Sequence, residues 1–272
     1  MSNIKVCLDA GHYGKYNQSP AVETYYESDM NWKLHLMLKE ELEKYGVEVI
    51  TTRDDQQTDK PLFERGETSQ GCDLFLSIHS NSSANGDVKE TVDRPVAIVQ
   101  LDGMGDELGQ LLANCVARVM ETKQAGQFYS RSGRRGEYYG VLRGAAAVGT
   151  MGILLEHSFH TNTRSTLWLL DDSNLRKLAV NEAKVIYDYF TERKEARTVD
   201  IQLKVLRKGK IRGDPQIQNL QRILKDMGYY DMEVDGSFGG GTQRAVKAFQ
   251  EDRAIDIDGI VGRETWIQLL TK

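Results

Sequence analysis

Short apolar runs alternate with amphipathic stretches over the first 190 residues of the chain. Apolar runs bounded by glycine or polar residues predict strands, and they are residues 4–12, 47–53, 74–78, 96–101 and 153–155. The segments between them that predict helices are residues 28–45, 61–70, 106–122 and 171–190. Strands alternating with helices indicate an α/β fold, with a mainly parallel twisted sheet flanked by helices.

The first helix has a clear start and end in the sequence. Ser28 or Asp29 is the expected N-cap, and Gly46 is expected to end the helix. Glu27 then lies directly before the start of this helix, close to the strand that precedes the helix. The first strand ends at His12, which Gly11 and Gly14 place on a turn at the carboxyl edge of the sheet, where open α/β sheets bind ligands.

A second, small three-helix domain follows. Its predicted helices are residues 214–228, 242–252 and 263–270, and glycine-rich turns separate them. The predicted core of this domain is Leu220, Ile223, Leu224, Val246, Phe249, Trp266 and Leu269. The charged run at residues 191–197 has no apolar face, so we expect it to begin an exposed linker. The predicted domains are therefore residues 1–190 and 206–272, joined by a linker at 191–205.

Composition excludes several classes of protein. The net charge of -5 and the pI near 5.7 argue against nucleic-acid binding and against a polybasic membrane attachment. Cys7, Cys72 and Cys115 lie far apart in the sequence and are expected to be reduced thiols. The sequence shows neither a signal-peptide pattern nor an apolar run of membrane-spanning length, so we expect synthesis in the cytoplasm without membrane insertion. The oligomeric state is not determined by these features.

Four titratable residues have the types and positions of a hydrolytic zinc site. His12 and His79 end two strands, Glu27 begins a helix and Glu156 ends another strand. Zinc catalysis needs three protein ligands and a nearby base, which His12, Glu27 and His79 could provide together with Glu156. No local motif of the H-E-x-x-H type joins them, so core histidines and a solvated helix-start charge are open alternatives.

Ordered motifs around these residues resemble the zinc-dependent N-acetylmuramoyl-L-alanine amidases over about residues 4 to 190. The motifs are D-A-G-H (residues 9–12), Glu27, T-R (52–53), S-I-H-S-N (77–81), V-L-R (141–143) and L-L-E-H-S-F-H-T-N (154–162). The resemblance implies that His12, Glu27 and His79 hold Zn²⁺ and that Glu156 is catalytic.

The same motifs suggest substrate contacts and show departures from the family. Asn81, Arg143 and His160 are expected to bind substrate. The segment before Glu156 lacks a usual proline, and His157 and His160 replace customary small or apolar residues. Strand alternation is expected to turn His157 away from Glu156. The arginines and tyrosines of residues 127–143 predict either carboxylate recognition or a solvated loop.

The C-terminal segment is similar to the three-helix peptidoglycan-binding module of cell-wall hydrolases. The matching stretches are residues 220–230, 234–239, 242–250 and 258–266, with a repeated G-x-x-T-x-x-x-L spacing. Both resemblances imply one partner, bacterial peptidoglycan, and hydrolysis of the amide between N-acetylmuramic acid and L-alanine.

The setting and the rival functions follow from the same resemblances. Without a visible signal peptide, a phage endolysin that acts at the wall after release is the first expectation, and a bacterial autolysin is the second. A zinc peptidase that cuts the stem peptide, and a non-catalytic wall-binding protein, are the alternative functions.

Overall fold

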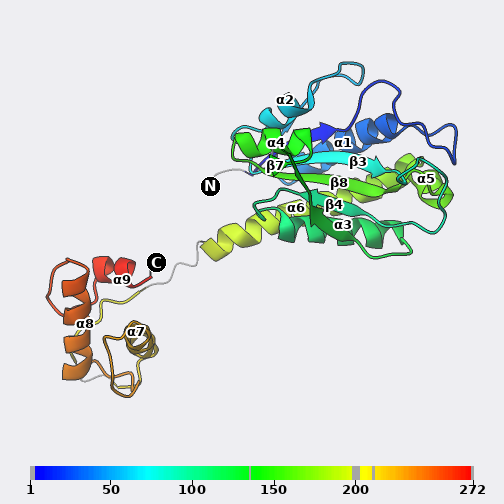
Figure 1. Ribbon diagram of the computed structural model, residues 1–272. Coiled ribbons are helices and arrows are strands. Elements are labelled where there is room, and N and C mark those ends of the chain that lie inside the picture. Colours follow the sequence, from blue (N-terminus) through cyan, green and yellow to red (C-terminus); the bar gives the residue numbers. More distant parts are fainter. Residues whose placement is uncertain (1–3, 135, 198–202, 210–211, 271–272) are drawn as a thin grey trace. The chain divides into compact units, whose positions relative to one another are not determined.

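The computed structural model describes residues 4–134, 136–197, 203–209 and 212–270 (Figure 1). The chain divides into two compact units, Met1–Arg197 and Thr198–Lys272. Each unit has its own cluster of buried apolar side chains.

A six-stranded sheet forms the centre of the first unit. Its strands are β1 (Lys5–Ala10), β2 (Glu48–Thr51), β3 (Leu74–Asn81), β4 (Val96–Val99), β5 (Gln127–Ser130) and β8 (Met151–Phe159), in the order β2-β1-β3-β8-β4-β5. Neighbouring strands from β2 to β8 are parallel, β4 is antiparallel to β8, and β5 is parallel to β4. The mainly parallel α/β sheet is confirmed. A separate two-stranded ribbon contains β6 (Ser132–Gly133) and β7 (Gly136–Glu137).

Helices cover both faces of this sheet (Figure 1). One face packs against α1 (Glu27–Lys44), α3 (Asp106–Met120) and α6 (Asp172–Arg197), which supply most of the larger core. The other face carries α2 (Leu62–Glu67) and α4 (Gly140–Ala147), and α5 (Thr163–Leu169) follows β8. A side chain on Gly144 of α4 would come within 2.0 Å of the Phe63 carbonyl oxygen, so glycine permits the close approach of α2 and α4.

Several predicted boundaries are wrong for identifiable reasons. The N-cap of α1 is Tyr26, with no side-chain cap bond, and Glu27 is the first helical residue. Helix α6 continues through the charged run to Arg197, because Glu, Lys, Ala and Arg are strong helix formers even without an apolar face. The short helices α4 and α5 were not predicted, and β8 is longer than its apolar centre indicated.

Three helices build the second unit, as predicted. They are α7 (Pro215–Asp226), α8 (Gly240–Asp252) and α9 (Arg263–Leu270). Asp214 caps α7 by accepting hydrogen bonds from the backbone of Gln216 and Ile217, and Pro215 occupies the first helical position. The predicted apolar residues of this domain all belong to its core.

A buried glutamine ties α7 to the turn that precedes α8. The Gln221 side-chain nitrogen lies within hydrogen-bond distance of Asp235 Oδ1 at 2.8 Å, the Ser237 carbonyl at 3.2 Å and Thr242 Oγ1 at 3.1 Å, which share its two hydrogens. Its oxygen accepts from Gly236 N at 2.9 Å. One side chain therefore satisfies the polar groups of a whole glycine turn, which is the condition for burying them.

The same arrangement recurs between α8 and α9. The Gln250 side-chain nitrogen lies within hydrogen-bond distance of Asp258 Oδ1 at 2.9 Å, the Ile260 carbonyl at 3.0 Å and Thr265 Oγ1 at 3.1 Å. Its side-chain oxygen accepts from Gly259 N at 2.9 Å. The repeated glycine and threonine spacing in the sequence is thus the trace of two equivalent buried turns.

We expect Gln221→Leu to weaken the second unit without affecting the first. Leucine leaves buried partners such as Gly236 N unpaired, and each such group costs about 1 to 3 kcal/mol. Amide hydrogen exchange read by mass spectrometry should show faster exchange in α7 and α8 only. Gln218→Leu, a change at a half-buried position of the same helix, is the matched control. Equal exchange in both variants would contradict this role of Gln221.

Candidate metal centre

The turn after β1 holds His12 in an unusual backbone conformation. Its φ is +62°, in the left-handed region, where a non-glycine residue is uncommon. Arg65 Nη2 donates to the His12 carbonyl at 3.3 Å, and the Arg53 guanidinium donates to the carbonyl of Ala10. Two arginines therefore fix the backbone on either side of Gly11.

Beneath this turn lies the fully buried carboxylate of Asp9. Its two oxygens accept from Thr52 Oγ1 at 2.6 Å and from Ser77 Oγ at 2.7 Å, and Arg65 Nη1 lies 3.6 Å away. Thr52 follows β2 and Ser77 belongs to β3, so one carboxylate connects three neighbouring strands to α2. Its negative charge is balanced by a buried arginine.

His12, Glu27 and His79 meet at the carboxyl edge of the sheet. Within the part of the chain that the structure describes, they are the one group of three or more His, Cys, Asp or Glu residues whose ligand atoms all lie within 4.8 Å of one another. Glu27 Oε1 lies 2.9 Å from His79 Nδ1, and Glu27 Oε2 lies 3.2 Å from His12 Nε2. Glu27 is buried, whereas both histidines are partly exposed. Two imidazoles and a carboxylate form a donor set that suits a divalent metal, zinc above all.

The electrostatics favour an ionised Glu27. Burial alone raises the pKa of this carboxyl, but hydrogen bonds and charge interactions with His12 and His79 outweigh burial and hold the pKa well below its usual range. The Ser80 backbone N–H adds a hydrogen bond to Glu27 Oε1 at 3.1 Å. The carboxylate is therefore ready to act as an anionic ligand.

Glu156 stands beside this group because of strand register. It is the partner of His79 in the parallel pairing of β3 with β8, so the two side chains point to the same face of the sheet. Burial, followed by the charge of Glu27, raises the pKa of Glu156 well above its usual range. Its Oε2 is buried without a hydrogen-bond partner among the described residues. A buried carboxylate oxygen without a partner, in register with a residue of the site, is suited to taking up a proton.

Some residues around the centre had no signal in the sequence. Asn17 lies in a polar loop, yet its side-chain nitrogen donates to Glu27 Oε2 at 2.6 Å and lies 3.1 Å from His12 Nε2. Tyr25 is almost fully buried and donates from its hydroxyl to Ser80 Oγ at 2.7 Å, behind Glu27. No spacing or motif relates these residues to the histidines, because only the folded loop brings them together.

The three residues expected to contact substrate differ in burial and in hydrogen-bond partners. The His160 ring is buried, with Nδ1 2.9 Å from the Ser80 carbonyl. Arg143 Nη1 donates to the carbonyls of Glu137 and Tyr138 at 3.0 and 2.8 Å. Asn81 is half-buried, and its side-chain oxygen accepts from Ser82 N. As substrate contacts, His160, Arg143 and Asn81 stay predictions.

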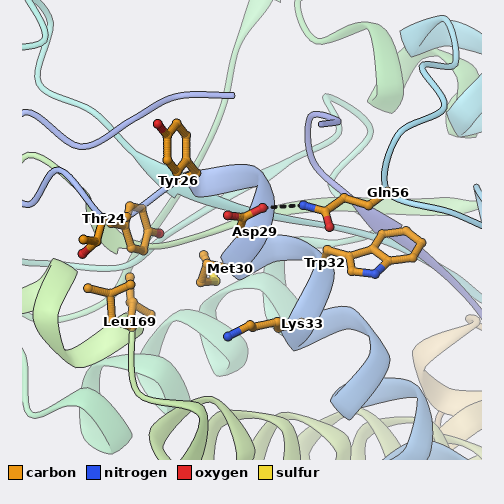
Figure 2. A pocket seen from close by; sticks show the side chains of 10 residues that line it. Thr24, Tyr26, Asp29, Met30, Trp32, Lys33, Gln56 and Leu169 are labelled. Atoms are coloured by element: carbon orange, nitrogen blue, oxygen red, sulfur yellow. Dashed lines mark hydrogen bonds between the residues drawn. The ribbon is translucent and has the colours of Figure 1, made fainter. Parts of the chain in front are cut away.

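The other prominent features lie outside the centre. A pocket of about 270 Å³ beside the start of α1 is lined by Tyr26, Asp29, Trp32 and Lys33, among others, and Asp29 accepts a hydrogen bond from Gln56 (Figure 2). His12, Glu27, His79 and Glu156 are not among its lining residues. No helix in the described ranges has both the length and the apolar character of a membrane span.

Two family models match this chain. Residues 6–188 match the model described as N-acetylmuramoyl-L-alanine amidase, and residues 213–269 match that of a peptidoglycan binding domain. The first match contains all four residues of the centre.

Curated relatives share only short segments with the chain. A spore cortex-lytic enzyme of Oceanobacillus iheyensis is 34% identical over 77 residues, which are 28% of this chain and 27% of that protein. Another spore cortex-lytic enzyme, from Bacillus cereus, is 45% identical over 53 residues, or 20% of each chain. The chain thus spans about a quarter or less of the length of these relatives.

Solved structures share the fold of the first unit. The CwlD amidase of Clostridioides difficile, in complex with the GerS lipoprotein, matches with a TM-score of 0.60 at 22% identity, over 70% of this chain and 100% of that chain. The catalytic domain of CwlV, an N-acetylmuramoyl-L-alanine amidase from Bacillus (Paenibacillus) polymyxa var. colistinus, matches with a TM-score of 0.58 at 21% identity, over 69% and 98%.

We expect Gly11→Ala to disrupt the centre while leaving its donor atoms in the chain. A Cβ atom at position 11 would come within 2.3 Å of the His79 ring, so the ring must move. The affinity for zinc, measured by competition with a chromophoric chelator, should fall about 10- to 100-fold, as for other losses of ligand support. Gly262→Ala, at a position with no atom near the added Cβ and no left-handed backbone, controls for the loss of a glycine. Unchanged affinity in Gly11→Ala would contradict the role of His79 as a ligand.

Proposed function

Because the chain belongs to the N-acetylmuramoyl-L-alanine amidase family, we propose that it hydrolyses the amide bond between N-acetylmuramic acid and L-alanine in bacterial peptidoglycan. The observation that carries this proposal is the convergence of His12, Glu27 and His79, with Glu156 in register beside His79. The setting of the reaction, phage lysis or bacterial wall turnover, stays a prediction.

His12, Glu27 and His79 are proposed to hold a zinc ion. The fit rests on the donor set, on its access to solvent through two partly exposed histidines, and on the space that Gly11 leaves for the His79 ring. When bound, zinc supplies a Lewis acid for the scissile carbonyl.

Glu156 is proposed to move the proton. Its unpaired Oε2 would accept a proton from the attacking water and later return it to the leaving amine of alanine. The raised pKa of this carboxyl makes Glu156 a stronger base for taking up the proton, which it can then return to the leaving amine.

The second unit is proposed to hold the enzyme on its insoluble substrate. Residues 213–269 match a peptidoglycan binding domain, and binding to the wall would raise the effective concentration of the catalytic unit there. We propose a catalytic domain at residues 1–190 and a wall-binding domain at 206–272, with the end of α6 extending into the segment between them.

We expect metal removal to abolish hydrolysis. A chelator should stop the release of peptides from purified walls, and zinc should restore it, because the carbonyl loses its Lewis acid. Mass spectrometry of the products should show peptides with a new alanine amino terminus and uncut glycan. Cuts within the stem peptide would indicate a peptidase, and full activity after thorough metal removal would exclude the zinc mechanism.

We expect Glu156→Gln to bind zinc and walls normally and to lose most turnover. The amide keeps the shape of the side chain but cannot accept the proton, and such groups contribute about 10²- to 10⁴-fold in rate. Single-turnover kinetics on a soluble muropeptide, together with zinc titration, measure both properties. Loss of zinc in this variant would identify Glu156 as a ligand instead.

We expect the two units to work separately. A chain ending after Arg197, at the boundary between the units, should bind zinc and cleave soluble muropeptide like the whole protein but act poorly on intact walls. Residues 205–272 should sediment with walls and hydrolyse nothing, because all four residues of the centre lie in the first unit. If the shorter N-terminal chain aggregates or loses activity on soluble substrate, the units share a core and this division is wrong.

A further inference from the structure

The pairing of β3 with β8 is interrupted next to the metal centre. His79 pairs with Glu156, but Asn81 pairs with Phe159, so β8 contains one extra residue at this point. Ser158 has a φ of +59°, as expected where a strand bulges. The bulge follows directly after the pair formed by the ligand His79 and the catalytic Glu156.

The imidazole of His157 bonds to β3 at this bulge. Its Nδ1 lies 3.0 Å from the carbonyl oxygen of His79, and since a carbonyl can only accept, Nδ1 carries the proton. Beyond the bulge the backbone resumes its contact, with His160 N donating to the Asn81 carbonyl at 2.8 Å. The His157 side chain therefore gives the His79 carbonyl a hydrogen bond at the point where the strand pairing is broken.

A carboxylate from a distant helix holds this imidazole. Glu182 of α6 places Oε1 2.9 Å from His157 Nε2, and both side chains are completely inaccessible to solvent. Glu182 Oε2 has no hydrogen-bond partner among the described residues. Burying such a pair is expensive, and an apolar pair of similar volume is often equally stable or more stable. Packing alone does not account for a histidine and a glutamate at these positions.

We propose that the His157–Glu182 pair is a positioning device that fixes the backbone of His79, and thereby sets the metal ligand His79 relative to Glu156. The inference rests on the proposed function for the roles of His79 and Glu156. Successive residues of β8 point to opposite faces of the sheet. Glu156 faces the centre, while His157 faces the core and donates a hydrogen bond to the neighbouring strand. A misplacement of about 1 Å between reacting groups can cost about 10²-fold in rate.

The decisive variant is the double substitution His157→Leu with Glu182→Leu in the full-length protein. It removes the positioning hydrogen bond without leaving a lone buried charge, so we expect its thermal midpoint to equal or exceed that of each single variant. We nevertheless expect its zinc dissociation constant, from chelator competition, to weaken about 10- to 100-fold. On a soluble muropeptide, kcat should fall about 10- to 100-fold with KM changed less than about twofold.

Two further variants control this result. Glu182→Gln should behave nearly like the wild type, because the amide can donate to a neutral His157 ring whose Nδ1 still donates to His79. His35→Leu removes another buried imidazole, one that bonds the Trp32 carbonyl within α1, and should leave zinc affinity unchanged.

Several outcomes would overturn the inference. Wild-type zinc affinity and kcat in the double variant would show that the pair only fills the core, as would equal losses in His35→Leu. Losses in Glu182→Gln as large as in Glu182→Leu would show that the hydrogen bond to His79 is not what matters. A wild-type protein that binds zinc but cleaves no muropeptide would refute the proposed function instead, while zinc affinity would still decide the role of the pair.

Discussion

The buried carboxylate of Asp9 is the constraint on which the metal centre depends. An unpartnered charge at this depth would be very costly, and Thr52, Ser77 and Arg65 supply the partners that allow the carboxylate to be buried beneath the strand ends. Arg65 also bonds the carbonyl of His12, whose left-handed backbone costs about 1 to 3 kcal/mol unless the surroundings enforce it. The arginine that balances the Asp9 carboxylate thus also holds His12, the first of the proposed metal ligands, in position.

Parallel pairing of the strands brings the other residues of the centre together. Because β1, β3 and β8 run in the same direction, residues just at or beyond their carboxyl ends gather at one edge of the sheet, and His12, His79 and Glu156 come from three different parts of the chain. Helix α1 adds Glu27 at its first turn. Register determines which side chains face one another, and it places Glu156 opposite His79 directly before the bulge. A shift of one residue would turn Glu156 into the core and His157 toward the ligands.

Much of the fold could be predicted from the sequence, as could the grouping of His12, Glu27 and His79, whose role as ligands stays a prediction. Alternating apolar runs indicate the sheet, and ordered motifs indicate His12, Glu27 and His79. What could not be predicted depends on contacts between distant segments. Nothing in the sequence links Glu182 to His157, because the two meet only when α6 packs on the sheet. The predicted end of α6 is wrong because it was placed where the apolar face of the helix stops. Residues with high helix propensity continue the helix from there to Arg197.

Buried glutamines of the second unit differ in their hydrogen bonding from two glutamates of the first unit. In the second unit, Gln221 and Gln250 have donors and acceptors matched on every side, and such complete networks make a small fold unique and rigid. In the first unit, Glu156 and Glu182 each bury an oxygen that has no partner among the described residues, which lowers the stability of the fold. The unpaired oxygen at Glu156 suits the proton acceptor proposed above, and the one at Glu182 belongs to the side chain whose other oxygen lies 2.9 Å from His157 Nε2. The cost of leaving these two oxygens unpaired fits the roles proposed for Glu156 and Glu182, which need a side chain placed for more than packing.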